Sequence, residues 1–234
     1  MALPKLMHPT FELTIPSTKK KARFRPFLVK EEKLLLMAKQ SGESNDIVNV
    51  IEQVIINCDV DNIIEPQSLA SFDIETLFLK LRAKSVGEEI DISYRDPEDD
   101  KTYDFKINID DVNPKEDPEH SNIIKLSETS GIVMRYPNTK LLSDVINRDD
   151  VADVLFFMIK GCLQSYYDGD LVVHFKDATP EEIDDFVDSL PSGVMKDFEK
   201  FFDTMPKLYH KLEYTNEKGT KRVIELTTIE DFFT

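Results

Sequence analysis

Few side chains in this sequence have the types and spacing that catalysis requires. Cys162 and His174 could supply a nucleophile and a base, but Cys162 falls on the apolar stripe of a predicted helix, where buried and inert thiols are common. Asp59 and Asp61 could do the acid–base work of a hydrolase, although such carboxylates are also typical turn formers after a helix. We therefore predict that the protein is not an enzyme. A hydrolase that uses Asp59, Asp61 or the carboxylates of the acidic loop 96–102 stays as a competing hypothesis.

Metal and nucleotide sites lack support as well. The four histidines are scattered, neither cysteine has a partner at metal-ligand spacing, and the seven glycines stand apart from one another. The acidic loop 96–102 offers alternating oxygen ligands, but Lys101 and Ile107 stand where a calcium loop needs glycine and glutamate. We interpret this loop as a solvated hairpin tip, and we expect no metal and no cofactor.

The first third of the chain is predicted to be mainly helical. Residues 10–15 and the basic run 19–25 predict two N-terminal strands. Three helices follow, at 29–40, 45–58 and 74–87. Cys58 completes an apolar helix face, which explains this thiol without a disulfide.

The middle of the chain changes from a helical to an extended period. Residues 90–94 and 103–109 alternate between apolar and polar side chains, which predicts an antiparallel hairpin with one solvated face. Further strand candidates at 123–126 and 131–136 would extend it to a meander of up to four strands.

Helical spacing returns in the last third. The predicted helices cover 141–146, 151–163, 180–190 with Thr179 as the N-cap, and 194–205. A hairpin of 208–214 and 221–226 closes the chain around a polar turn at 216–219.

These patterns predict an α+β fold with a helical N-terminal third, a central antiparallel β-meander, and C-terminal helices followed by a β-hairpin. The predicted regions are a strand pair plus helices at 1–87, an antiparallel β region at 88–137, a helical region at 138–205 and a C-terminal hairpin at 206–234. They could form one compact domain or two closely packed ones.

The composition indicates a folded and acidic protein. The 234 residues include 29 Lys and Arg against 45 Asp and Glu, a formal net charge of −16, and 41% of them are hydrophobic. The longest uninterrupted apolar run, 154–159, is far shorter than the roughly 20 residues that a membrane-spanning helix needs. The N-terminus shows no signal-peptide pattern. We expect a cytoplasmic protein that does not enter a membrane.

Charge is distributed unevenly along the chain. Residues 1–40 hold nine basic side chains against three acidic ones, a net charge of +6, whereas the other 194 residues carry −22. The basic segment could contact a partner, complement the acidic body of the same chain, or form a solvated strand edge whose lysines prevent pairing. We favour a protein partner, because the acidic body would repel DNA phosphates. A nucleic-acid-associated or DNA-mimicking acidic protein remains the alternative.

Three strings resemble the baseplate hub assembly proteins of T-even-type contractile-tailed phages. They are RFRPFLVKEEKLLLMA at 23–38, LPKL at 3–6 with FEL at 11–13, and FFDTMPKL at 201–208 before a hairpin that ends in DFF at 231–233. Some members of that family carry cysteines in the terminal hairpin. This sequence has Tyr209, His210 and Tyr214 in that region, so the resemblance implies no terminal zinc site here.

The resemblance implies a non-enzymatic phage tail protein that is required to assemble the central hub of the baseplate. Such a protein would bind other hub proteins or the tape-measure protein, as an assembly factor or chaperone or as a hub subunit. It would act in the host cytoplasm during assembly and could remain in the virion tail baseplate. The sequence leaves its oligomeric state open.

The basic and aromatic segment is the predicted partner-binding site. Arginines supply forked hydrogen bonds and phenylalanines supply anchors at protein interfaces. The alternation of side chains leaves open which of the aromatic residues packs in the core instead. The candidate residues are Lys19, Lys20, Lys21, Arg23, Phe24, Arg25 and Phe27.

Overall fold

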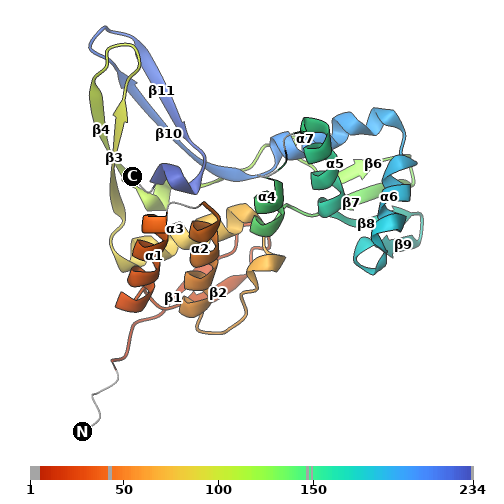
Figure 1. The fold of residues 1–234 in the computed structure, drawn as a ribbon, viewed down its shortest axis with the longest axis horizontal. Helices are drawn as coiled ribbons and strands as arrows, with labels where there is room; N and C mark the ends of the chain where they lie inside the picture. The colour runs from red at the N-terminus through yellow and green to blue at the C-terminus, as the bar shows by residue number, and fades with distance from the viewer. Residues whose placement is uncertain (1–5, 42–43, 146–147, 149, 233–234) are drawn as a thin grey trace. The chain divides into compact units, whose positions relative to one another are not determined.

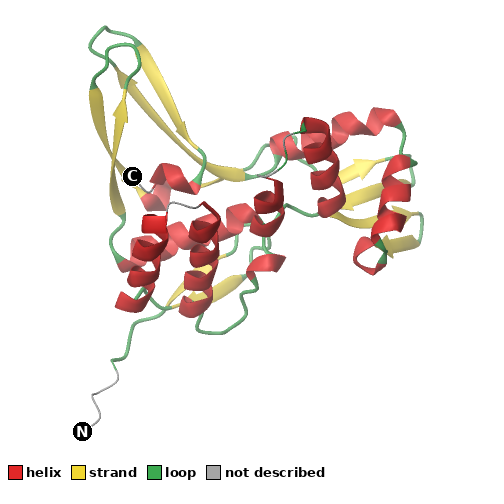
Figure 2. Ribbon diagram, viewed as in Figure 1, coloured by secondary structure: helices red, strands yellow, loops and turns green. Residues whose placement is uncertain are grey.

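The chain forms two compact units in the computed structural model, which describes residues 6–41, 44–145, 148 and 150–232. Unit 1 comprises Met1–Lys115 and Lys207–Thr234, and unit 2 comprises Glu116–Pro206. Unit 2 is therefore an insertion between two segments of unit 1 (Figure 1). Helices and small antiparallel sheets occur in both units, so the predicted α+β class is confirmed (Figure 2).

Unit 1 begins with a strand pair and three helices, as predicted. Strands β1 (Phe11–Thr14) and β2 (Lys21–Phe24) pair antiparallel, and helices α1 (Val29–Ser41), α2 (Ser44–Cys58) and α3 (Ser71–Ser85) follow. The apolar stripe of α2 is buried from Ile51 to Cys58, which has no exposed surface, and Ile47 and Val50 before it are partly buried. The thiol thus completes an apolar helix face.

Two long hairpins are the main elements in the rest of unit 1. Strand β3 (Glu89–Arg95) pairs with β4 (Thr102–Asn108), and β10 (Lys207–Thr215) pairs with β11 (Lys221–Leu226) and with the short strand β5 (Asn113–Lys115). Buried side chains at the base of both hairpins pack against α3 in one cluster. We call β3, β4, β10 and β11 together the arm. The two hairpins of the arm run side by side and meet at their tips (Figure 1).

Unit 2 is built on a four-stranded antiparallel sheet in the order β6-β7-β8-β9. Its strands are β6 (Ile123–Lys125), β7 (Ser130–Met134), β8 (Leu163–Asp168) and β9 (Leu171–His174). The predicted four-stranded meander is wrong in its pairing, because β6 and β7 join β8 and β9 rather than β3 and β4. Region 88–137 therefore contributes to both units.

Strands β8 and β9 also lie within the region 138–205, which we predicted as a helical region with no element assigned between residues 163 and 180. They form a hairpin around Gly169, whose φ of +56° suits a residue without a side chain. Consecutive apolar residues in β9 and aromatic residues in β8 do not alternate with polar ones, and the pattern of a half-buried strand is therefore missing.

The helices of unit 2 agree with their predicted positions. They are α4 (Thr139–Val145), α5 (Val151–Cys162), α6 (Pro180–Asp188) and α7 (Met195–Thr204). Thr179 caps α6 as predicted, because its Oγ1 accepts the Glu182 N–H at 3.2 Å while Glu182 Oε2 accepts the Thr179 N–H at 2.8 Å. Three parts of the predictions lie outside the described residues: residues 3–5 of the N-terminal string, Ile146 at the predicted end of the first of these helices, and Phe233 of the closing string.

The two ends of unit 2 are tied together inside the unit. His120 Nδ1 and Thr204 Oγ1 lie 2.9 Å apart, and Lys200 Nζ lies 3.0 Å from Glu119 Oε2. The His120 ring also packs against Phe201, with 5.4 Å between ring centroids. Residues near the start and the end of the insertion are therefore neighbours. Within the described part of the chain, no helix has both the length and the apolar character needed to cross a bilayer.

Candidate functional site

The three predicted lysines lie on the surface of unit 1, around the turn between β1 and β2. Lys19, Lys20 and Lys21 are all exposed. Lys21 Nζ lies 3.2 Å from Glu12 Oε2 on the paired strand, and both side chains remain more than half exposed. These ammonium groups can reach an acidic surface, as the predicted role requires.

Arg23 is also on the surface but is already paired. Its guanidinium forks onto the Asp61 carboxylate, with Nη2–Oδ1 at 2.5 Å and Nε–Oδ1 at 3.1 Å. This hydrogen bonding raises the pKa of Arg23 and lowers the pKa of Asp61. Asp59, the other carboxylate considered for hydrolysis, accepts the backbone N–H groups of Asp61 at 3.0 Å and Ile64 at 2.8 Å. The two carboxylates thus hold a turn and an ion pair.

Arg25 holds unit 1 together from a largely buried position. Its Nη2 lies 2.9 Å from Glu31 Oε1 and donates to the Asn57 carbonyl at 2.7 Å. Glu31 has no exposed surface, and its Oε2 accepts the Leu28 N–H at 2.9 Å. Burial by itself would raise the pKa of Glu31, but hydrogen bonds from Arg25 and Leu28 outweigh it and lower the pKa. This ion pair fixes the path from β2 into α1 against the end of α2.

The two phenylalanines of the predicted site differ in their placement. Phe24 has 0% exposure and lies in the core with Ile55 and Phe78. Phe27 is half-buried, and its ring lies 5.6 Å from the Phe78 ring between centroids. The structure therefore answers the open question: Phe24 is the core residue, and Phe27 keeps a surface that a partner can reach.

Cys162 and His174 are not arranged as a nucleophile and base. Cys162 is completely buried at the end of α5, whereas His174 is exposed at the end of β9. Burial raises the pKa of the Cys162 thiol to about 12, so that the thiol stays protonated at neutral pH. In the described part of the chain, no three His, Cys, Asp or Glu side chains are grouped so that they could hold a metal ion.

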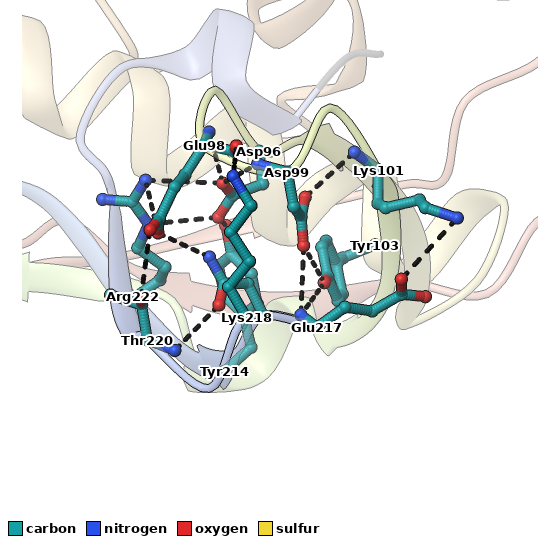
Figure 3. A network of polar contacts seen from close by, with 11 residues as sticks. Asp96, Glu98, Asp99, Lys101, Tyr103, Tyr214, Glu217, Lys218, Thr220 and Arg222 are labelled. Carbon is teal, nitrogen blue, oxygen red and sulfur yellow. Dashed lines mark hydrogen bonds and ion pairs between the residues drawn. The ribbon is translucent and has the colours of Figure 1, made fainter.

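The acidic loop 96–102 forms the predicted hairpin tip, but it also meets the tip of the other hairpin of the arm (Figure 3). Asp96 has 0% exposure. Its Oδ2 accepts a hydrogen bond from Tyr214 Oη at 2.5 Å and one from Arg222 Nε at 3.1 Å. Its Oδ1 accepts the Glu98 backbone N–H at 2.7 Å. One carboxylate thus joins β3–β4 to β10–β11.

The ionised form of Asp96 is stabilised by these donors. Burial alone would raise the pKa of its carboxyl group, but the hydrogen bonds from Tyr214, the Glu98 backbone and Arg222 outweigh burial and hold the pKa well below its usual range. Burial and the hydrogen bond to Asp96 raise the pKa of the Tyr214 phenol in turn. The carboxylate is therefore charged and the phenol protonated at neutral pH.

Further contacts extend the joint on both sides of Asp96. Asp99 Oδ2 accepts hydrogen bonds from Tyr103 Oη at 2.6 Å and from the Glu217 backbone N–H at 3.0 Å. Glu98 Oε2 accepts the Asn216 Nδ2–H at 2.7 Å. We use the name tip joint for the residues Asp96, Glu98, Asp99, Tyr103, Tyr214, Asn216, Glu217 and Arg222. Figure 3 labels all of them except Asn216.

Aromatic rings of β4 and β10 pack against one another next to the hydrogen bonds of the tip joint. The Tyr214 ring of β10 lies 4.6 Å from the Tyr103 ring and 5.5 Å from the Phe105 ring, both on β4, between centroids. Such ring pairs add to the stability that burial of their surface provides. Side-chain packing and hydrogen bonds therefore join the two hairpins of the arm, each of which alone would be marginally stable in water.

An apolar groove of about 360 Å³ opens between α1, α2 and α3. Its walls include Phe27, Leu36, Ile47, Phe78 and Val86. Phe27, one of the predicted partner-binding residues, thus lines a concave apolar surface. The sequence did not indicate this groove, because α1 has apolar residues on several faces and no face is marked as unpartnered by spacing alone.

A protein-family model matches nearly the whole chain. Its description is T4 bacteriophage base plate protein, and it matches residues 8–234. No curated protein and no solved structure matches the chain.

Proposed function

The chain belongs to the family of T4 bacteriophage base plate proteins, and from this premise we propose that it acts without catalysis, by binding hub or tape-measure proteins while the central hub is assembled. Membership of this family gives the protein a structural or assembly role in the tail baseplate of the virion, with other phage baseplate proteins as its partners. The finer assignment, as a hub subunit or as an assembly factor that acts in the host cytoplasm, belongs to the proposal.

The apolar groove of unit 1 is the observation that carries this proposal. At its rim, Leu36 is 56% exposed and Val86 is 63% exposed. Val29 is seven residues before Leu36, on the same face of α1, and it is 87% exposed. Soluble proteins rarely leave several large apolar side chains exposed around one concavity unless another protein covers them. A groove of this kind suits a contact surface.

The proposed occupant is an aliphatic or aromatic side chain of a hub or tape-measure protein. It would enter the groove beside Phe27 and displace water from Leu36 and Val86. Desolvated anchors of this type carry most of the affinity at protein interfaces. The charged side chains at the groove, which orient a partner rather than hold it, are Glu32, Lys39 and Arg82.

Leu36→Asp is expected to weaken binding of the co-expressed hub or tape-measure protein by about tenfold or more. The reason is that removing water from an unpaired carboxylate in the groove costs free energy. Retention of the partner in a pull-down at moderate salt, followed by titration, measures the effect. Met37→Asp is the matched control. Met37 is 58% exposed, next to Leu36 on the same helix but outside the groove.

Equal binding by the two variants would contradict the groove as the contact surface. Loss of binding in both variants together with loss of helical circular dichroism would mean that α1 had unfolded. In that case Val86→Asp repeats the test from α3's side of the groove.

Neutralising the exposed lysines is expected to weaken the same complex in a salt-dependent manner. Lys19, Lys20 and Lys21 are replaced together by glutamine, and Arg25 is left intact because it is structural. Loss of three exposed cations should slow association by roughly tenfold at low salt and have little effect at high salt. Three exposed lysines elsewhere provide the control triple, Lys125, Lys196 and Lys221. Equal losses in both triples would show that only net charge matters.

The alternative of a nucleic-acid-associated or DNA-mimicking protein makes a different prediction in the same preparations. Salt-dependent retardation of DNA in a mobility-shift assay, or displacement of a DNA-binding protein from DNA, would favour it. Mass spectrometry of purified particles beside the infected-cell lysate separates a hub subunit, which stays in the particle, from an assembly factor, which leaves.

A further inference from the structure

Strand β9 ends the sheet of unit 2 with an unusual surface. It pairs with β8 on one side only, and the order β6-β7-β8-β9 leaves its other side free. All four of its residues are exposed, including Leu171 at 57%, Val172 at 55% and Val173 at 44%. In an antiparallel strand, alternate residues direct their N–H and C=O groups to each side. The free side of β9 therefore offers backbone hydrogen-bonding groups that β8 does not use.

Apart from its short length of four residues, this edge lacks the features that normally prevent edge pairing. Natural edge strands carry charges, prolines or bulges that block another strand. Among the strands that the structure describes, the other edges have such residues, for example Lys125 in β6, Pro114 in β5 and Lys221 in β11. The β9 sequence, Leu-Val-Val-His, contains β-branched and apolar residues without a charge or a proline. The composition of β9 is therefore typical of a strand that is paired on both sides.

Charge indicates what kind of neighbour fits. Asp168 and Asp170 flank the turn at one end of β9, and Asp177 follows its other end, all of them exposed. Lys176 is the nearby cation. Unit 2 as a whole has 19 acidic against 8 basic side chains, a net charge of −11. A strand that pairs with β9 therefore meets two carboxylates at the Gly169 end, whereas Lys176 offsets Asp177 at the other end, and the unit as a whole is negative.

The same charges disfavour a second copy of this chain as the strand that pairs with β9. If β9 paired antiparallel with β9 of a second copy, the Asp168 and Asp170 end of each strand would meet the Asp177 end of the other. Two units of −11 would also be brought together. Like charges placed opposite each other destabilise a strand pair.

We propose that β9 is a docking edge for an extended, basic segment of another protein, which adds to the sheet of unit 2 as a fifth strand. The added strand has apolar or β-branched residues at its centre, against Leu171, Val172 and Val173, and Lys or Arg at its ends, against the flanking carboxylates. Main-chain hydrogen bonds supply affinity and the terminal cations supply selection for a basic partner. This surface is separate from the groove of unit 1, and either can fail without the other.

Two blocked synthetic peptides test the edge with the full-length protein. One has the sequence Lys-Val-Thr-Val-Thr-Lys, and the other has Glu in place of both lysines. The basic peptide is expected to shift the backbone amide NMR signals of residues 171–174 and to bind at least about tenfold more tightly than the acidic peptide, with an affinity that falls as salt rises. Equal binding of the two peptides, or no shift in β9, would overturn the proposal.

Variants at exposed positions identify the edge and its charge preference. Val172→Lys is expected to weaken the basic peptide by at least about tenfold, whereas Val172→Glu weakens it less, because the carboxylate attracts the peptide. Ile123→Lys on the opposite edge strand, β6, is the control and should leave binding unchanged. Circular dichroism checks that each variant is folded. A dimer of the wild-type protein that Val172→Lys abolishes would overturn the proposal, since the occupant would then be a second copy.

Discussion

Arg25→Ala lowers the free energy of unfolding by about 3 kcal/mol, because it leaves the buried Glu31 carboxylate without its ionic partner. Glu31 keeps the Leu28 N–H at 2.9 Å and the exposed Lys30 ammonium at 3.4 Å, which do not replace a buried guanidinium. The substitution also frees the Asn57 carbonyl at the end of α2, which Arg25 holds at 2.7 Å. Urea unfolding followed by circular dichroism measures the change.

Arg23→Ala is the matched control, because Arg23 lies two residues earlier, on β2, whereas Arg25 follows the end of that strand. Its forked pair with Asp61 lies on the surface, with more than half of the Arg23 side chain exposed, so water screens the interaction and little stability is lost. An equal loss in the two variants would contradict the buried role of Arg25. A variant with both Arg25→Met and Glu31→Gln should recover part of the loss, because no charge is then buried alone.

Asp96→Asn is expected to open the tip joint. An amide cannot accept from Tyr214 and Arg222 as the carboxylate does, and its NH₂ group faces their donors. The backbone amides of residues 96–100 and 216–220 should then exchange with solvent about tenfold faster or more, while those of α1–α3 stay protected. Hydrogen-exchange mass spectrometry reads both regions in one experiment.

Asp100→Asn tests whether the effect belongs to Asp96 alone. Asp100 lies in the same loop, but its pair with Arg95 is exposed on both sides, and the residue's φ of +61° suits asparagine. This variant should exchange as the wild type does. Similar acceleration in both variants would mean that the loop opens independently of the Asp96 carboxylate.

The same carboxylate predicts a pH dependence with a definite sign. Because the folded state lowers the pKa of Asp96 below its unfolded value of about 3.9, the stabilisation is fully present above that pH. It is lost as the pH falls towards the depressed folded-state pKa. Exchange at the tips should therefore be protected equally at pH 7 and pH 5, after correction for the intrinsic exchange rate, and the protection should fall in strong acid.

Local periodicity predicted those elements whose two faces differ. The stripe that ends at Cys58 marks α2, and the alternation at 90–94 and 103–109 marks the first hairpin of the arm. Strand β9 has no such contrast, since Leu171, Val172 and Val173 are all exposed and all apolar. Gly169 between two aspartates was the available turn signal there.

Contacts between distant segments were beyond prediction from one sequence. Asp96 and Tyr214 are 118 residues apart, and the local sequence of neither hairpin indicates that it contacts the other. The burial of Glu31 likewise depends on the end of α2, which no spacing in 23–38 reveals. For the predicted partner-binding site, the charge of the lysines was enough to predict that they are exposed. The alternation of β2, which buries Ala22 and Phe24, could have assigned Phe24 to the core.

The insertion of unit 2 has a consequence for the order of events on the ribosome. Synthesis delivers residues 116–206 before β10 and β11, and unit 2 can therefore finish folding while unit 1 still lacks two strands of its arm. Until then the side chains of β3 and β4 that will contact Tyr214, Leu208 and Leu226 face water. The tip joint can form only after Tyr214 and Arg222 have been translated, so that the two hairpins of the arm cannot be joined before that point.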